Sequence, residues 1–239
     1  MTEKDFSLLE NSLQVAFKDK DLLKQAFTHR SYLNENADIQ LAHNERLEFL
    51  GDAVLELLVT EYLYQTYPDK TEGELTVWRA ALVNAKMLAQ VAKDLKLNDF
   101  LLLSKGEKRE TGKARDYILA NTTEAFFGAL YLDQGQKVCK KLVEQYILSK
   151  LPQILEEKLF EDAKSRFQEL AQEKTGITPI YQVLQEWGPD HAKHFRIGVL
   201  LEKEHIAEGE GTSKQEAEQD AARAALEKKE KEWVKRPSL

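Results

Sequence analysis

The residues best placed to do chemistry are three acids near the start of one predicted helix. Glu45, Glu48 and Asp52 stand at i, i+3 and i+7 in a proline-free stretch that runs from Asn44 to about Tyr64 and is rich in Leu, Val and Tyr. This pattern predicts a helix, and the spacing places the three carboxylates in one row on its surface. Asn44 is expected to cap the helix by accepting a hydrogen bond from a free backbone amide.

Such a row needs a positive partner. Like charges destabilise an exposed helix by roughly 0.2–0.5 kcal/mol per neighbouring pair, and Arg46 lies about 100° or more around the helix from Glu45 and Asp52. A bound divalent cation would offset the repulsion, and Mg²⁺ prefers carboxylate oxygens. A solvated acidic face is the alternative, in which Glu45 still favours the helix dipole. The row alone leaves these two interpretations even.

A second predicted helix carries a polar pair among apolar residues. In the stretch from Asp116 to Asp133, Asn121 and Glu124 are three residues apart and share a face. A lone ionised carboxylate is costly in apolar surroundings, so the pair could face the acidic row across a metal-binding cleft. Ordinary hydrogen bonding of the pair is the equally weighted alternative.

Two blocks of the sequence resemble ribonuclease III, the family of enzymes that cut double-stranded RNA. They are Asn44 to Asp52 and Ala26 to Tyr32, and the helix around Asn121 also matches, with asparagine where the family usually has aspartate. The resemblance implies Mg²⁺, with Mn²⁺ as a substitute, and it implies that Asp52 and Glu124 are catalytic. It assigns the metal to Glu48, Asp52, Asn121 and Glu124.

The same resemblance assigns further roles. Phe49 is expected to insert into the partner of a homodimer, with an ordinary core phenylalanine as the alternative, and Glu45 and Glu72 are possible accessory acids near the cleft. His29 is expected to form structural hydrogen bonds rather than to catalyse, because nothing nearby supplies a nucleophile for it to activate. The neutral side chain of Asn121 can still bind Mg²⁺, but we expect the site to need more metal, or to tolerate Mn²⁺ well.

The remainder of residues 1–160 predicts further helices, which makes the amino-terminal endonuclease domain all-α. Helices are expected over residues 4–17, 74–95 and 138–160, with an interruption or kink at Pro152 in the last one, and a short helix is expected around Leu22 to Phe27. The loop over residues 105–115 either contacts phosphates or is simply solvated, and the two interpretations are equal. The side chains considered for phosphate contact are Lys108, Arg109, Lys113 and Arg115.

The pattern changes after a short linker at residues 161–164, where we place the domain boundary. A helix over residues 165–175 precedes three strands, the second of which alternates apolar residues from Phe195 to Leu201. Ser213 and Glu216 then form a capping box that opens a last helix. The order α-β-β-β-α predicts a small α+β domain at residues 161–232, followed by a flexible tail at 233–239.

This second domain resembles a double-stranded RNA-binding domain, in residues 188–195 and 209–217. The resemblance implies that Gln168 and Glu169 meet one minor groove and that His191 meets the next. It also implies that Lys214 contacts phosphates across the major groove between them, and Lys193, in the loop of His191, is counted among the RNA-binding residues. Such domains read the shape of A-form duplexes rather than their sequence.

The net charge of the chain limits how strongly it is expected to bind RNA. The 239-residue chain has a net charge of −7, which argues against indiscriminate nucleic-acid binding. From Glu161 onward, 13 basic residues stand against 16 acidic ones, a net charge of −3, and Gln215 replaces a second basic residue that the family often has. We therefore expect modest RNA affinity from this domain, with avidity added by dimerisation.

Together the two resemblances imply a bacterial ribonuclease III. Its product ends would be 5′-phosphate and 3′-hydroxyl with short 3′ overhangs, and its substrates ribosomal RNA precursors and other structured transcripts. Alternatives are a non-cleaving protein that binds duplex RNA, favoured by Asn121 alone, and a DNA nuclease, which the 2′-hydroxyl readout of the second domain disfavours. No apolar run approaches the roughly 18 residues of a membrane span, and the single Cys139 fits a reducing cytoplasm.

Overall fold

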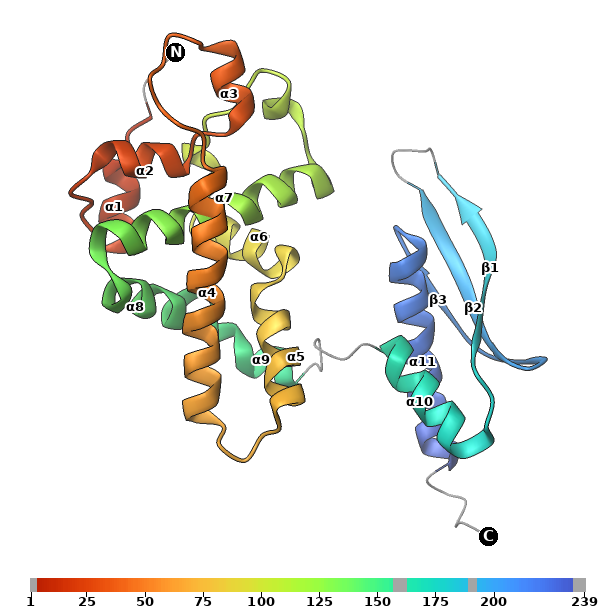
Figure 1. Ribbon diagram of the computed structural model, residues 1–239. Coiled ribbons are helices and arrows are strands. Elements are labelled where there is room, and N and C mark those ends of the chain that lie inside the picture. The colour runs from red at the N-terminus through yellow and green to blue at the C-terminus, as the bar shows by residue number, and fades with distance from the viewer. Residues whose placement is uncertain (1–3, 157–162, 189–192, 234–239) are drawn as a thin grey trace. The chain divides into compact units, whose positions relative to one another are not determined.

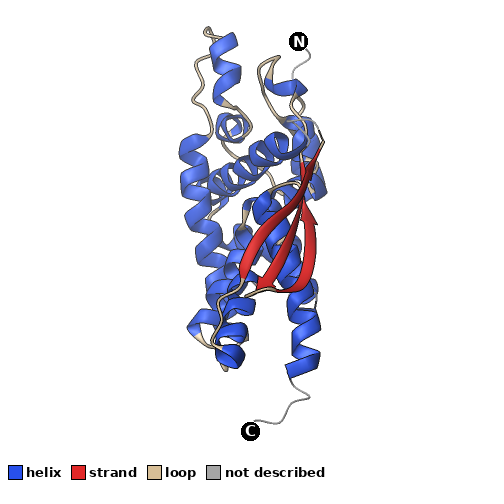
Figure 2. Ribbon diagram, turned by 90° about the vertical axis from the view of Figure 1, so that its right-hand side faces the viewer, coloured by secondary structure: helices blue, strands red, loops and turns tan. Residues whose placement is uncertain are grey.

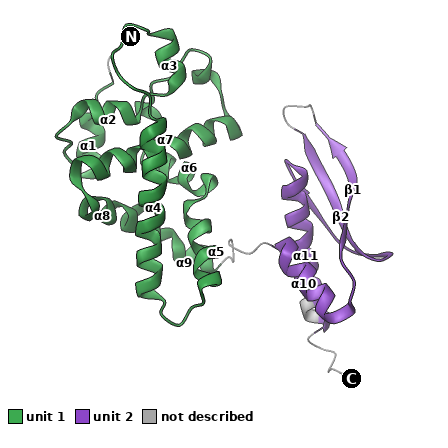
Figure 3. Ribbon diagram, in the orientation of Figure 1, with its two compact units in different colours: residues 1–160 green, residues 161–239 purple. Residues whose placement is uncertain are grey.

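Helices alone build the described part of residues 1–160, whereas every described strand lies in residues 161–239 (Figure 1, Figure 2). These ranges form two compact units of the computed structural model (Figure 3), which describes residues 4–156, 163–188 and 193–233. The predicted fold class, an all-α unit followed by a small α+β unit, is confirmed. Among the described helices, none combines the length and apolar character that crossing a membrane requires.

Two long helices, α4 (Glu45–Thr66) and α7 (Gly112–Gln134), dominate the first unit. Shorter helices surround them: α1 (Ser7–Leu13), α2 (Lys20–Ala26), α3 (Arg30–Glu35), α5 (Glu72–Val83), α6 (Ala85–Asp94), α8 (Gln136–Tyr146) and α9 (Leu151–Glu156). Short 3₁₀ helices lie at Leu97–Phe100, Glu107–Arg109 and Leu148–Lys150.

Helix α7 runs through the centre of the first core. Between Ile118 and Leu130 every side chain is buried except those of Asn121 and Glu124. A helix that is apolar on nearly all faces must be covered on all sides, and α7 is packed by α2, α4, α6 and α8. The two polar side chains therefore mark the one place along this stretch where the core opens toward solvent.

The prediction of one long helix over residues 74–95 is wrong. Helix α5 ends at Val83 and α6 begins at Ala85, because Asn84 takes an extended backbone conformation with ψ of 160°. The Asn84 side-chain oxygen accepts a hydrogen bond from the Met87 amide at 2.9 Å and so caps α6. This local bond competes with helix continuation.

Other helix boundaries also differ from those predicted. Helix α1 is shorter than expected because Gln14 adopts the left-handed conformation, with φ of 54°. Helix α7 begins at Gly112 rather than at residue 116. The predicted interruption at Pro152 is confirmed, since α8 ends at Tyr146 and α9 begins at Leu151. Pro152 is the second residue of α9, where its missing amide hydrogen would have no helical partner.

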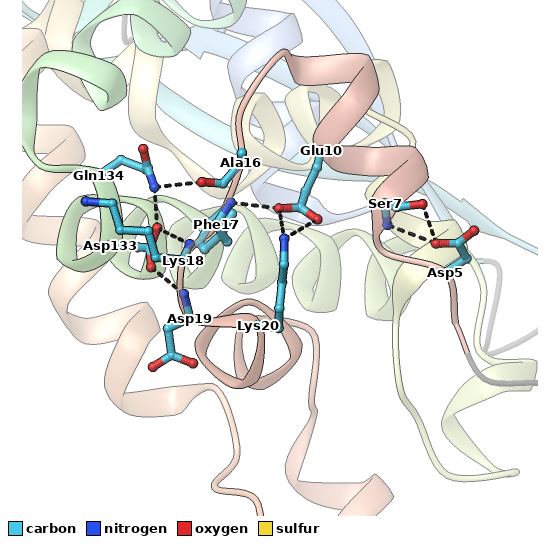
Figure 4. A network of polar contacts seen from close by, with 10 residues as sticks. All are labelled: Asp5, Ser7, Glu10, Ala16, Phe17, Lys18, Asp19, Lys20, Asp133 and Gln134. Carbon is cyan, nitrogen blue, oxygen red and sulfur yellow. Dashed lines mark hydrogen bonds and ion pairs between the residues drawn. The ribbon is translucent and has the colours of Figure 1, made fainter.

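A polar network fixes the loop after α1 to the carboxyl end of α7 (Figure 4). The Asp133 carboxylate accepts hydrogen bonds from the backbone amides of Lys18 and Asp19, at 2.9 and 2.8 Å. Glu10, buried on α1, pairs with Lys20 at 2.6 Å. These contacts give the buried carboxylate of Glu10 a partner and hold one end of α7 in place.

In the second unit, two helices cover one face of an antiparallel sheet. Helix α10 (Ala163–Thr175) precedes the strands β1 (Ile180–Trp187), β2 (His194–Leu201) and β3 (Glu204–Gly211), which pair in the order β1-β2-β3, and α11 (Lys214–Trp233) follows. The core between sheet and helices includes Phe167, Val199, Ile206 and Ala221. The predicted order of elements is confirmed.

The ends of this unit differ slightly from the sequence prediction. Ala163 and Lys164, which the sequence places in a linker, begin α10. Trp233, which the sequence places in the tail, is the last residue of α11, and its ring stacks on that of Phe167 with centroids 6.5 Å apart. This apolar contact extends the folded unit by one residue. Residues 161–162 and 234–239 lie outside the described residues.

Candidate functional site

Helix α4 begins at a buried residue that ties it to α2. The Asn44 amide donates to the Thr28 carbonyl at 2.9 Å, and its side-chain nitrogen donates to the Ala26 carbonyl at 3.4 Å. Asn44 makes no side-chain capping bond, so that prediction is wrong: the side chain anchors the helix to its neighbour instead. This anchor fixes the first turn of α4, which carries Glu45 and Glu48.

Helices α4 and α7 touch backbone to backbone through a pair of glycines. These helices pack together more extensively than any other two described elements. A Cβ atom on Gly51 would lie 1.7 Å from the Glu124 carbonyl oxygen, and one on Gly128 would lie 2.2 Å from the Leu47 carbonyl oxygen. No side chain fits at either position, so the contact requires glycine on both helices.

This close approach brings the predicted metal ligands of the two helices together. Glu48 and Asp52 flank Gly51 on α4, and Glu124 lies on α7 where Gly51 meets it. Asp52 is exposed, whereas the other three side chains are half-buried. We call this group the α4–α7 cluster; its members are Glu48, Asp52, Asn121 and Glu124.

Burial and mutual repulsion perturb the acids of the α4–α7 cluster. Burial, and then the charges of Asp52 and Glu48, raise the pKa of Glu124 from its usual 4.5 to about 7. The pKa of Glu48 is also raised, first by burial, then by Glu45 and to a smaller degree by Asp52, while a hydrogen bond from Asn121 opposes the rise. No cation among the described residues contributes to either shift.

The donor set of the α4–α7 cluster fits a hard divalent cation. Three carboxylates and one amide supply only oxygen ligands, as Mg²⁺ and Mn²⁺ prefer. Among the described residues, however, no three Asp, Glu, His or Cys side chains already stand as close together as the ligands of one ion. The carboxylates are near enough to repel one another, and a cation would have to draw them inward.

The two accessory acids lie in different surroundings. Glu45 forms an ion pair with Arg30, which offsets part of its charge, and His43 Nδ1 lies 3.8 Å from its carboxylate. Glu72 lies at the start of α5, beyond the far end of α4 and thus about 27 Å along that helix from Glu48. Within one chain, Glu72 is not part of the cluster.

His29 and Arg115 form structural contacts. His29 Nδ1 accepts a hydrogen bond from the Ser31 amide at 3.3 Å and caps α3. In the cationic loop, the Arg115 guanidinium donates to the carbonyls of Glu107 and Glu110 at 2.8 and 3.2 Å, which holds the loop in shape. The cations Lys105, Lys108, Arg109 and Lys113 of the same loop are exposed.

An apolar stripe on α4 faces solvent. Phe49 is 82% exposed, Leu57 57% and Tyr64 75%, and together with Ala53 and Thr60 they repeat every three or four residues along one face. The alternative of an ordinary core phenylalanine at position 49 is wrong for this chain. A contiguous exposed apolar stripe of this kind is a candidate interaction surface.

In the second unit, two of the predicted RNA-binding lysines meet at one end of the sheet. Lys193 directly precedes β2 and Lys214 opens α11, and their Nζ atoms lie 3.3 and 3.4 Å from the Glu186 carboxylate on β1. Gln168 and Glu169 are exposed on α10. His191 lies outside the described residues.

Sequence reasoning did not single out Gly51, Gly128 or Glu186. Glycine inside a helix costs about 1 kcal/mol relative to alanine, so the two glycines within long predicted helices were a signal of close packing. The position of Glu186 depends on its pairing with Phe195 across β1 and β2, which the sequence does not reveal.

Comparisons with known proteins match both units. Residues 19–151 match the family model Ribonuclease-III-like, and residues 163–229 match the model for a double-stranded RNA binding motif. Ribonuclease 3 of Streptococcus pneumoniae (strain P1031) is 46% identical over 222 residues, which cover 93% of this chain and 95% of that protein. Ribonuclease 3 of Streptococcus equi subsp. zooepidemicus (strain H70) is 44% identical over 220 residues, covering 92% and 95%.

Solved structures match the first unit. A structure of the nuclease domain of ribonuclease III from Campylobacter jejuni, described for flexibility in a region involved in dimer formation, aligns with a TM-score of 0.56 at 42% identity and covers 62% of this chain and 99% of that chain. A 2.2 Å crystal structure of the same nuclease domain aligns with a TM-score of 0.55 at 43% identity and covers 62% and 97%. The order of the matching units agrees with the order that the motifs predicted.

The raised pKa of Glu124 makes the folded chain less stable at high pH when divalent cations are removed. Below its usual pKa of 4.5 the carboxyl group is protonated whether folded or unfolded, and up to about pH 7 only the folded chain keeps the proton. The free energy of unfolding therefore falls across this range. We expect Glu124→Gln to be more stable than wild type at pH 8 by about 1–2 kcal/mol after solvent screening, and equal to it at pH 4.

Urea denaturation in EDTA at both pH values measures this difference. Glu144→Gln, an exposed acid on α8 that loses the same charge, is the matched control and should stay within about 0.5 kcal/mol of wild type. If Glu124→Gln gains no stability at pH 8, the Glu124 carboxylate is not destabilised by burial and its neighbours.

Proposed function

Because this chain belongs to the ribonuclease III family and is a double-stranded-RNA endoribonuclease, we propose that it hydrolyses RNA phosphodiesters at the α4–α7 cluster with Mg²⁺, for which Mn²⁺ can substitute. The observation that carries the proposal is the meeting of oxygen ligands from two helices beside a glycine contact. The products would be 5′-phosphate and 3′-hydroxyl ends with short 3′ overhangs.

Each side chain of the α4–α7 cluster has a distinct part in this proposal. Asp52 is exposed and open to substrate, whereas Glu124 must lose its proton before its carboxylate can serve as a ligand, so metal binding releases a proton. The Asn121 amide lies close enough to Glu48 to lower the pKa of that acid, and its carbonyl oxygen would be the ligand. A bound divalent ion would lower the pKa of the attacking water and stabilise the leaving oxygen.

The second unit supplies duplex recognition. We assign Gln168, Glu169, Lys193 and Lys214 to contacts with the grooves and phosphates of A-form RNA, and His191 to the same surface. Structured transcripts, including ribosomal RNA precursors, are the substrates that such shape recognition favours. We place the enzyme in the cytoplasm, where the buried free thiol of Cys139 would remain reduced.

We propose that the active form is a homodimer, because two antiparallel RNA strands require two cuts and a two-fold axis supplies two clefts. The exposed stripe on α4 supports this arrangement. Leu57 lies eight residues after Phe49 and seven before Tyr64, so a two-fold axis near Leu57 would bring Phe49 of each chain to the Tyr64 end of its partner.

A groove at the Tyr64 end could receive the inserted phenylalanine. It has a volume of about 700 Å³ and is lined by residues that include Leu63, Tyr64 and Tyr67, together with Glu72. The same symmetry would bring Glu72 toward the cleft of the partner chain, which is how this acid could act as an accessory although it is remote from the cleft of its own chain.

Asn121 favours one rival function, a protein that holds duplex RNA without cutting it. Replacing an aspartate by a neutral amide removes one negative charge from the cluster, and loss of acids weakens metal binding. The remaining acids, Glu48, Asp52 and Glu124, still meet across α4 and α7, which favours cleavage.

The test of the proposed function is incubation of labelled duplex RNA with the wild-type chain in Mg²⁺ or in EDTA. We expect cleavage in Mg²⁺, binding without cleavage in EDTA, and intact DNA duplex in both. Glu124→Gln should bind RNA but cleave it about 100-fold more slowly or worse, because the cluster loses an anionic ligand, whereas the control Glu144→Gln should cleave at the wild-type rate. Binding with no cleavage in Mg²⁺ or Mn²⁺ would establish the rival function.

The amide at position 121 should set the metal requirement of cleavage. We expect Asn121→Asp to reach half-maximal rate at a Mg²⁺ concentration about tenfold lower than wild type, because the added charge strengthens binding of a hard cation. Titrations of the initial rate against Mg²⁺ and Mn²⁺ measure this. Equal requirements in the two proteins would mean that residue 121 does not contact the ion.

Phe49 should control dimerisation. We expect Phe49→Ala to weaken the dimer by about 2–4 kcal/mol, as for a central aromatic contact, and to lower the cleavage rate at protein concentrations where the variant is monomeric. Sedimentation measures the first effect. Leu8→Ala, which shortens an exposed apolar side chain on α1 (62% exposed), is the control, and a Phe49→Ala variant that remains fully dimeric would contradict the assignment.

A further inference from the structure

Glu186 holds the two lysines that the second unit offers to RNA. It lies on β1 opposite Phe195 of β2, and the Lys214 Nζ atom stands 5.7 Å above the centre of the Phe195 ring. From the other side, Lys193 reaches the same carboxylate. The Glu186 carboxylate thus forms ion pairs with lysines from two separate segments. Its oxygens lie 3.3 Å from Lys193 Nζ and 3.4 Å from Lys214 Nζ.

No second acid shares this position among the described residues. The ion pairs that Lys193 and Lys214 form there both end on Glu186. The other acid–base pair at this end of the sheet, Arg196 with Glu210 at 2.6 Å, joins β2 to β3 one register position away. Removing the Glu186 charge would therefore free both lysines at once.

The Glu186 carboxylate resembles a phosphate oxygen that is bound by both lysines. It is anionic, it pairs with two ammonium groups, and its side chain is partly exposed to solvent. Contacts with Lys193, and less strongly with Lys214, lower the pKa of Glu186, so it stays ionised at neutral pH. An RNA phosphate that approaches either lysine meets this negative charge and must displace it.

We propose that Glu186 is an intramolecular competitor of RNA phosphates, which holds Lys193 and Lys214 together and lowers the affinity of the second unit for duplex RNA. The proposal rests on the RNA-binding role of the two lysines given under the proposed function. An RNA duplex that supplies phosphates to both lysines replaces both of their ion pairs with Glu186. An anion that reaches only one lysine leaves Glu186 paired with the other.

Duplex binding by the full-length variant E186Q tests this. We expect it to bind a 20-base-pair RNA duplex about threefold to tenfold more tightly than wild type in EDTA at 0.1 M salt, because both lysines lose the carboxylate that competes with phosphate. The gain should shrink as salt is raised, because screening weakens the competing charge. Fluorescence anisotropy of a labelled duplex gives both dissociation constants across a salt series.

E210Q is the matched control. It removes the same charge from the same sheet and breaks a comparable ion pair, to Arg196, without freeing Lys193 or Lys214. If release of Lys193 and Lys214, and not the change in net charge, is what tightens duplex binding, E210Q should change the affinity for the duplex by less than about twofold. Equal gains in E186Q and E210Q would overturn the proposal.

The lysine variants separate this proposal from the one on which it rests. K193A and K214A should each weaken binding, and E186Q/K214A should show a smaller gain over K214A than E186Q shows over wild type. If neither lysine variant weakens binding, the assigned RNA contacts are wrong and the competitor role falls with them. If both weaken it while E186Q binds like wild type or more weakly, only the competitor role is wrong.

Discussion

The backbone contact between α4 and α7 is the constraint on which the site depends. Gly51 and Gly128 let the two helices meet without side chains between them, and apolar residues packed around α7 supply the free energy that keeps them together. Acids beside this contact have no freedom to move far apart. The packed core thus holds these acids close together, and burial, followed by the charges of Asp52 and Glu48, raises the pKa of Glu124.

Charged side chains are arranged in opposite ways in the two units. The first gathers carboxylates that lack a cationic partner among the described residues, which suits an ion from solution. The second gathers lysines around Glu186, so its cations are already partly neutralised. In a chain with a net charge of −7, this arrangement limits non-specific attraction to nucleic acid.

Features with a regular period could be predicted from the sequence, whereas features that depend on distant contacts could not. Helical spacing placed Glu48 and Asp52 in one row, and strand alternation placed Val199 and Leu201 in the core. The break at Asn84 was missed because a single side-chain hydrogen bond decides it. The anchoring of Asn44 to Ala26 and the pairing of Glu186 with Phe195 depend on segments that meet only in the fold, and a motif alone does not specify such meetings.

Asn121 is best understood from the electrostatics of the cluster rather than as a lost ligand. An aspartate there would place another negative charge beside Glu48 and Glu124, whose pKa values burial and neighbouring acids already raise. The amide of Asn121 instead lowers the pKa of Glu48 and so favours its charged form. Asparagine therefore weakens attraction for a cation but lowers the repulsion that the folded chain must bear. On this argument, asparagine at position 121 is compatible with the proposed active site, with lower metal affinity and higher stability than aspartate as the expected balance.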